Sequence, residues 1–318
     1  MKKLKVVFFG TPDFAKASLQ AIHKSHHEVV GVVTVADKAS GRGQKINESP
    51  VKKFAVQEGL PLFQPIKLRD SEFLNNIKAL NADVFVVVAF RMMPKVLFGI
   101  PPLGTFNIHA SLLPDYRGAA PINFAIINGE KESGVTSFFI NEKIDEGHIL
   151  LQEKTEISDT ENAGNLHDKL MELGADLAVK TLNGLAEGTL QEKPQPEVEN
   201  PKTASKIFKE DLVIDWNQNS KKIYDFIRGM SPFPVAFTTL EIDGEKKIFK
   251  IFEGEYQLLS HQKPAGTLEW NQQTLQIFTA DGIYFPKEVQ LAGKKRMSVK
   301  DFLNGLQHSK NIQIIDGI

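Results

Sequence analysis

The sequence predicts an α/β fold, a doubly wound and mostly parallel Rossmann-like sheet, followed by a small OB-like β-barrel. Strand-like and helix-like segments alternate through the first half of the chain. The strands there are continuous apolar runs, which is typical of a parallel sheet covered on both faces. After a polar stretch, several short strands follow one another at regular spacing, which indicates a barrel.

The chain has 318 residues, enough for two domains that each bury a core. We expect a first domain at 1–188, a linker at 189–206 and a second domain at 207–318. The stretch TLQEKPQPEVENPKTASK predicts the linker, because it has three prolines, mixed charge and almost no large apolar residue.

The elements of the first domain follow from apolar patterns. Four buried strands are predicted, at residues 5–9, 29–35, 83–90 and 106–109. Residues 13–25 and 162–187 have helical spacing, and residues 135–140 add a further strand. In the second domain a helix is predicted at 219–229. Its strands are predicted at 235–242, 246–254, 266–270, 274–280 and 282–291. Ser298 and Asp301 form a capping box for a last helix at 299–306.

Composition excludes several kinds of chemistry. The chain carries 38 Lys and Arg against 39 Asp and Glu, which argues against a generally basic nucleic-acid binder but permits a local patch. It has no cysteine, which excludes disulfides, thiolate metal sites and a cysteine nucleophile. The histidines lack metal-ligand spacing, so we expect no metal.

The start of the chain predicts a buried strand. MKKLKVVFFG resembles the basic start of a signal peptide, but its apolar run of about five residues is too short. No apolar stretch approaches the roughly 20 residues of a membrane span. We therefore expect a cytoplasmic protein without a membrane partner.

Two glycine-containing loops resemble nucleotide-binding motifs only partly. Gly10 is followed by Thr11 and Pro12 instead of the G-x-G-x-x-G fingerprint, which disfavours NAD and predicts a simple turn with Pro12 as the first helical residue. Residues 39–45 form a glycine-rich loop that is not a Walker A motif. It is either a solvated loop or a basic loop that contacts phosphates.

The strongest candidate site lies at the end of the strand 106–109. Asn107 and His109 are two residues apart, so both point to one face while Phe106 and Ile108 turn to the other. A loop rich in Leu, Pro and Gly follows, and an open α/β sheet binds ligands at such carboxyl ends. Asp145, just before Gly147, is either a third member of the site or a turn-forming residue.

Four segments together resemble the methionyl-tRNA formyltransferases, a family of folate-dependent enzymes. They are GTPDFA, GRG with a following Lys, NIHASLLPDYRGAAPI and IDEG, in the order of that family. The resemblance covers the linker and the barrel as well. It implies that Asn107, His109 and Asp145 are catalytic, with Asp145 either orienting and charging the imidazole or accepting the amine proton.

The resemblance also implies binding residues. The tetrahydrofolate loop would consist of Ser111, Leu112, Leu113 and Pro114. The pterin pocket would be lined by Phe90, Arg91 and Met92, where family members often have a longer, glycine-containing loop. Phe14 would lie near the methionine. The tRNA acceptor end would meet Arg42 and Lys45, next to Gln44 where members often carry a basic residue.

The implied reaction is transfer of the formyl group of 10-formyltetrahydrofolate to the α-amine of methionyl-initiator tRNA. Charged tRNA and folate would be the partners, with no obligate protein partner. Lys221–Lys222, Lys246–Lys247 and Lys294–Arg296 would contact tRNA phosphates, or are solubilising surface charges. The alternatives are a folate-dependent formyltransferase acting on an amino sugar or glycinamide ribonucleotide, and a non-catalytic folate- or RNA-binding protein. Ser111 is a conceivable nucleophile, but it has no evident adjacent base.

Overall fold

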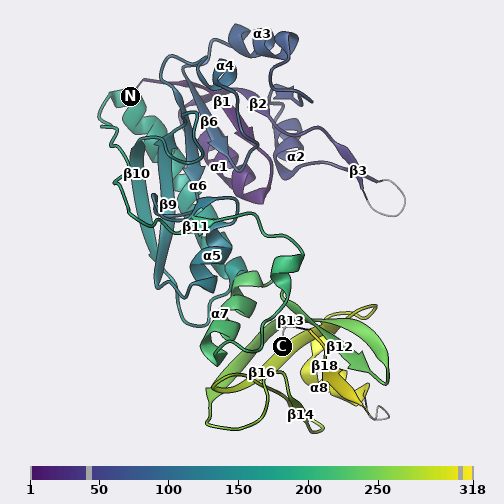
Figure 1. Cartoon of the computed structure of the whole chain (residues 1–318). Coiled ribbons are helices and arrows are strands. Elements are labelled where there is room, and N and C mark those ends of the chain that lie inside the picture. Colours follow the sequence, from purple (N-terminus) through teal and green to yellow (C-terminus); the bar gives the residue numbers. More distant parts are fainter. Residues whose placement is uncertain (1, 41–44, 307–310, 317–318) are drawn as a thin grey trace. The chain divides into compact units, whose positions relative to one another are not determined.

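The computed structural model describes residues 2–40, 45–306 and 311–316 (Figure 1). The chain divides into two units. The first comprises Met1–Gly118, Glu132–Glu156 and His167–Thr203; the second comprises Ala119–Lys131, Ile157–Leu166 and Ala204–Ile318. The domain boundaries expected at residues 188 and 206 stay predictions.

A seven-stranded sheet forms the first unit, in the order β10–β9–β7–β6–β1–β2–β5. The strands are β1 (Lys5–Gly10), β2 (Glu28–Val33), β5 (Leu62–Phe63), β6 (Val84–Val88), β7 (Thr105–His109), β9 (Glu132–Phe139) and β10 (Ile149–Glu156). The pairs β1–β2, β1–β6, β6–β7 and β2–β5 are parallel, whereas β9 is antiparallel to β7 and to β10. The predicted mostly parallel sheet is therefore confirmed.

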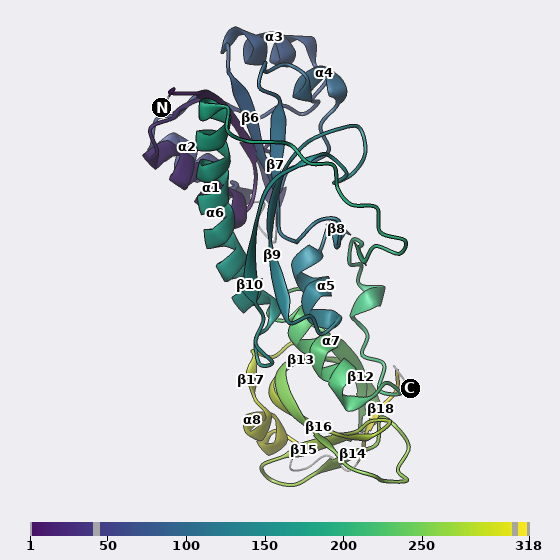
Figure 2. The same cartoon turned by 90° about the vertical axis from the view of Figure 1, so that its left-hand side faces the viewer.

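Helices cover this sheet. The first unit contains α1 (Asp13–Lys24), α2 (Pro50–Gln57), α3 (Ser71–Ala79), α4 (Lys95–Phe98) and most of α6 (Ala163–Glu187). Figure 2 shows α1, α2 and α6 together on one side of the strands. Phe9 and Phe85 pack in one cluster with Phe73 and Ile77 of α3. Because β1 and β6 are buried almost throughout, their apolar runs are continuous rather than alternating.

Short helices were the main omission of the sequence reading. Helix α2 begins after Ser49, whose side chain accepts a hydrogen bond from the Lys52 N–H, and α3 begins after Asp70, which accepts one from Phe73. These are ordinary N-caps, but eight or nine residues show too little apolar periodicity to stand out. Pro12 is the N-cap of α1, not its first residue as predicted.

The second unit contains an antiparallel, nearly closed barrel of order β14–β15–β16–β13–β12–β18, with β17 paired to β16. Its strands are β12 (Phe237–Ile242), β13 (Glu245–Leu258), β14 (Leu268–Trp270), β15 (Leu275–Phe278), β16 (Gly282–Leu291), β17 (Met297–Ser298) and β18 (Ile312–Ile314). Trp216, Phe249 and Tyr284 are fully buried in its core. The barrel prediction is confirmed.

Helices complete the second unit. They are α5 (Pro121–Ile127), the 3₁₀ helix η1 (Glu210–Leu212), α7 (Ser220–Met230) and α8 (Val299–Asn304). The Asn123 amide of α5 donates to the Gly229 carbonyl of α7 at 2.7 Å. Ser298 accepts from the Asp301 N–H at 3.1 Å, so the predicted cap is confirmed. Within the described part of the chain, every helix is too short or too polar to span a membrane.

Four short strands remain. β3 (Lys38–Ser40) pairs antiparallel with β4 (Lys45–Asn47) in the first unit. β8 (Arg117–Gly118) follows the loop after β7, and β11 (Thr203–Ala204) lies near the end of the predicted linker.

Candidate active site

His109 ends strand β7 and is only 6% exposed. Its Nε2 lies 2.9 Å from the Tyr116 carbonyl oxygen. A carbonyl only accepts hydrogen bonds, so Nε2 carries a proton and the second ring nitrogen, Nδ1, is the one available for chemistry. A neutral His109 therefore presents a bare Nδ1 that can take a proton, and a charged His109 presents an Nδ1–H donor.

Asn107 lies two residues before His109 on the same strand, and it is half-buried. Ile108 faces α6, since a Cβ added at Gly174 of that helix would lie 3.2 Å from the Ile108 side chain. Alternation along β7 then directs Asn107 and His109 to the other face. An amide donor and an imidazole thus project side by side, as the spacing predicts.

Asp145 lies in the connection between β9 and β10, and its side chain reaches His109. Its Oδ2 is 3.8 Å from His109 Nδ1 and accepts a hydrogen bond from the Gly118 N–H at 2.9 Å. The distance to the imidazole is longer than a hydrogen bond but suits an ion pair when Nδ1 is protonated. Asp145 has a φ of 53°, a left-handed conformation that is unusual for a residue other than glycine.

The loop after His109 is held by buried hydroxyl groups. Ser111 is 1% exposed and donates its hydroxyl proton to the Asp115 carbonyl at 2.7 Å. Thr136 donates to the Ser111 carbonyl at 2.6 Å and accepts from the Leu113 N–H at 3.2 Å. Ser111 therefore serves the shape of this loop, and its hydroxyl is hydrogen-bonded to a backbone carbonyl and not, among the described residues, to a base that would make it a nucleophile.

In the segment after β6, Phe90 and Arg91 contact other parts of the protein, whereas Met92 is exposed. The Phe90 ring lies 5.7 Å from the ring of Phe9, centroid to centroid. Arg91 donates to the backbone carbonyls of Pro65 and Ile66, so its guanidinium holds a neighbouring loop. Met92 is 72% exposed, which leaves it free to contact a ligand.

Of the remaining expected substrate residues, the structure describes the side chain of Phe14 alone. Phe14 is 6% exposed and packs with its ring edge-on to His167 of α6, 5.6 Å between centroids. Arg42 lies outside the described residues, as does Gln44. Lys45 belongs by its backbone to β4, and its side chain lies outside the described part of the structure.

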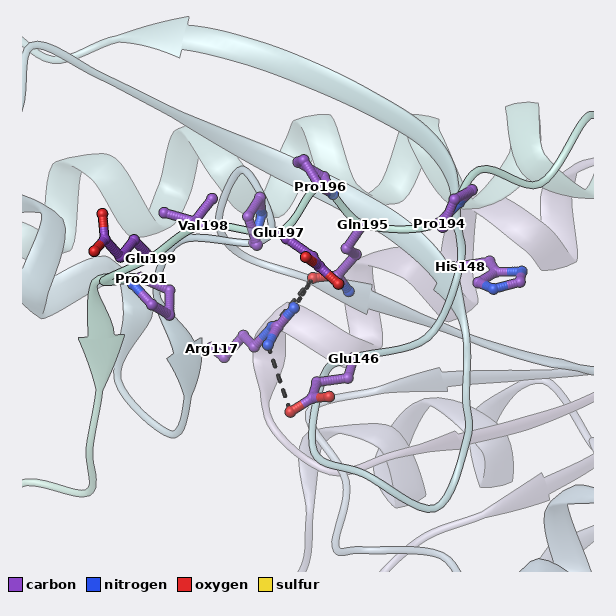
Figure 3. Close-up of a pocket in the computed structure, with 11 residues that line it drawn as sticks. Arg117, Glu146, His148, Pro194, Gln195, Pro196, Glu197, Val198, Glu199 and Pro201 are labelled. Carbon is purple, nitrogen blue, oxygen red and sulfur yellow. Dashed lines mark hydrogen bonds and ion pairs between the residues drawn. The ribbon is translucent and has the colours of Figure 1, made fainter.

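The structure adds two residues that the sequence patterns did not indicate, Gln195 and Arg117, which contact each other next to Glu146 (Figure 3). Gln195 comes from the predicted linker, and its amide group donates to the carbonyls of Asp145 and Gly147. Arg117 donates to the Gln195 carbonyl oxygen. Both border a cavity of about 690 Å³. The only signals in the sequence are a glutamine between two prolines and the arginine of the RGAAPI segment.

Metal binding has no support in the geometry. Among the residues that the structure describes, no three His, Asp or Glu side chains are grouped so that they could hold a metal ion.

A mostly parallel α/β unit with an asparagine, a histidine and an aspartate at this edge of the sheet, followed by a barrel, defines the class of two-domain formyltransferases. Residues 2–182 match the family model described as formyl transferase, and residues 206–307 match that of the formyl transferase C-terminal domain. A methionyl-tRNA formyltransferase of Azobacteroides pseudotrichonymphae is 50% identical over 311 residues, covering 95% of this chain and 96% of the relative. One of Flavobacterium psychrophilum is 46% identical and covers 98% of each chain. The chain belongs to the methionyl-tRNA formyltransferase family, as its motifs predict.

Solved structures agree with the fold. An N-formyltransferase of Helicobacter canadensis, in complex with folinic acid and dTDP-3-aminofucose, superposes with a TM-score of 0.65 at 21% identity, covering 89% of this chain and 98% of its own. HypX of Aquifex aeolicus in complex with tetrahydrofolic acid gives a TM-score of 0.64 at 15% identity, covering 96% of this chain and 48% of its own. At such identities the similarity concerns the fold alone.

Proposed function

We propose that the chain transfers the formyl group of 10-formyltetrahydrofolate to the α-amine of methionyl-initiator tRNA, with Asn107, His109 and Asp145 as catalytic residues. The observation that carries this proposal is the arrangement around His109. Its Nε2–H is committed to the Tyr116 carbonyl, while Nδ1 lies 3.8 Å from Asp145 Oδ2. The imidazole therefore has one nitrogen for orientation and one for proton transfer.

The reaction is a direct acyl transfer. The α-nitrogen, with a pKa of about 8 as a free amine, forms a bond to the formyl carbon. The bond from this carbon to N10 of the folate then breaks, and the proton lost by the amine ends on N10. In between, the formyl oxygen carries negative charge, and the Asn107 amide donates to it as in an oxyanion hole.

His109 and Asp145 carry out the proton transfer. Neutral His109 accepts the amine proton at Nδ1, and the imidazolium so formed is stabilised by the Asp145 carboxylate. The same Nδ1–H then protonates N10 as the formyl carbon departs from it. Asp145 is held for this role by the Gly118 N–H, which donates to Oδ2 at 2.9 Å.

The loop Ser111–Pro114 and the segment Phe90–Met92 supply the folate site. The first is held in shape by hydrogen bonds of Ser111 and Thr136, and the second exposes Met92. The methionyl-tRNA would be received by Phe14 on the methionine side and by Arg42 and Lys45 at the acceptor end, roles that rest on the family resemblance.

The test is a formyl-transfer assay with 10-formyltetrahydrofolate and charged initiator tRNA. We expect Asn107→Ala to slow the single-turnover rate by about 10²–10³, the usual loss for one preorganised donor. His109→Ala, which removes the general base, should slow it by a similar factor of about 10²–10³. Asp145→Asn should slow it by about 10²–10⁴, since an amide cannot stabilise an imidazolium.

The same assay decides the acceptor. A dTDP-amino sugar offered in place of the tRNA should not be formylated. Rapid formylation of the sugar, with none of the tRNA, would refute the proposed substrate. Variants with a normal single-turnover rate but weakened binding would instead assign the three residues to ligand positioning.

A further inference from the structure

We propose that Gln195, a residue of the predicted linker, positions the catalytic aspartate by holding the turn that carries it. The inference rests on the proposed function, since Gln195 acts through Asp145. It assigns a role in the reaction to a segment whose composition predicts a spacer.

The Gln195 side-chain amide is hydrogen-bonded through both its nitrogen and its oxygen, and Figure 3 shows the contact of its oxygen with Arg117. Its Nε2 donates to the carbonyl oxygens of Asp145 at 2.7 Å and Gly147 at 2.9 Å. Its Oε1 accepts from Nε and Nη2 of Arg117, at 3.1 and 2.5 Å. A guanidinium only donates and a carbonyl only accepts, so the amide has one possible orientation. It therefore acts as a fixed bridge between Arg117 and the turn.

The turn is held at three successive residues. Gln195 binds the carbonyls on either side of Glu146, and the Glu146 carboxylate lies 3.5 Å from Nη1 of Arg117. Asp145 needs such support because its φ of 53° is left-handed. Gly147 is equally constrained, since a Cβ there would lie 1.5 Å from the Phe139 carbonyl oxygen. The local sequence alone does not favour this conformation.

The linker is fixed so that Gln195 reaches the turn. The backbone of Lys193 exchanges two hydrogen bonds with Ile149 of β10, at 2.7 and 2.9 Å. Gln195 follows two residues later and is half-buried, whereas every other residue of 191–200 is exposed. A glutamine without a structural role in a spacer would be exposed like its neighbours.

The consequence concerns the chemical step. Without the bridge, Asp145 relaxes away from His109 Nδ1, which it approaches at 3.8 Å. Displacing a catalytic group by about 1 Å can cost as much as about 10²-fold in rate. The hydrogen bonds of Gln195 go to Arg117, Asp145 and Gly147. Pro114 of the proposed folate loop borders the same cavity but is not one of these partners, so substrate binding should change less than the rate.

The experiment compares Gln195→Ala and Gln195→Glu with the control Gln191→Ala, an exposed glutamine of the same linker. Gln195→Glu keeps the size of the side chain and its acceptor for Arg117, but it places a carboxylate oxygen against the two carbonyls. We expect both Gln195 variants to lower the single-turnover rate by about 10- to 100-fold, with an altered pH–rate profile. KM values and the urea midpoint should stay near those of the wild type. Gln191→Ala should match the wild type in every respect.

A double variant separates positioning from general damage. In the Asp145→Asn background, Gln195→Ala should add little further loss, because the group that it positions is already disabled. Full additivity would overturn the inference, as would a wild-type rate in Gln195→Ala. A wild-type rate in Asp145→Asn alone would remove the proposed role of Asp145, and this inference with it. If Gln195→Ala fails to fold, Gln195→Glu carries the test.

Discussion

Replacing Thr136 by valine should loosen the loop that follows His109. The Thr136 side chain is fully buried, and its hydroxyl makes three hydrogen bonds: to the Ser111 carbonyl at 2.6 Å, from the Leu113 N–H at 3.2 Å and from the Gln152 amide at 3.0 Å. Valine has nearly the same shape but no hydroxyl. Gln152 keeps a partner, since it also donates to the Leu113 carbonyl at 3.0 Å. The Ser111 carbonyl and the Leu113 N–H lose theirs.

Each unsatisfied buried group costs about 1–3 kcal/mol, so the loss of two partners should lower the free energy of unfolding of the first unit by about 2–6 kcal/mol. The KM for the folate substrate should rise, because this loop carries the proposed folate contacts. Urea unfolding and steady-state kinetics measure the two effects. Thr136→Ser is the matched control, since it keeps all three hydrogen bonds and loses one methyl group, worth about 1 kcal/mol. If valine destabilised the unit no more than serine, the hydroxyl would not hold the loop.

Three further predictions concern pH, a buried ion pair and salt. Burial lowers the pKa of His27 below its usual 6.5, so the unfolded chain takes up the proton before the folded one does. The free energy of unfolding should therefore decrease as the pH drops below about 6.5. Between pH 7 and 5.5 the urea midpoint of the wild type should decrease more than that of His27→Gln. Arg228→Met should lower the free energy of unfolding of the second unit by about 3 kcal/mol, because Asp225 loses a buried partner at 2.7 Å; a tolerated change would mean that the pair is dispensable. Lys294→Gln with Lys295→Gln should reduce the slope of log tRNA affinity against log salt by up to about 0.9 per lost phosphate contact; an unchanged slope would assign these lysines to solubility.

Local patterns were sufficient for the sheet and for part of the site. Strands β1 and β6 are continuous apolar runs because both faces of a parallel sheet are buried, and this signal needs no knowledge of partners. The common face of Asn107 and His109 follows from strand geometry alone. The Ser298 cap of α8 likewise depends on residues three apart.

The family motifs supplied Asp145, which no local pattern links to His109. Its carboxylate reaches the imidazole only because β9 pairs antiparallel with β7 and the chain then turns back through a left-handed residue. The proton on Nε2 of His109 was likewise unknowable, since it depends on a carbonyl placed by the fold of the next loop.

The predicted linker shows most clearly what cannot be predicted from the sequence. Its prolines, charges and lack of large apolar residues predict a spacer, and strand β11 (Thr203–Ala204) lies near its end. They say nothing of the hydrogen bonds between Lys193 and Ile149, or of Gln195 with the turn at Asp145, 50 residues away in sequence. Apolar periodicity reports which side of an element is buried, because burial acts on every residue of that side. A single polar contact between distant segments leaves no such pattern, and only the folded chain brings its two partners together.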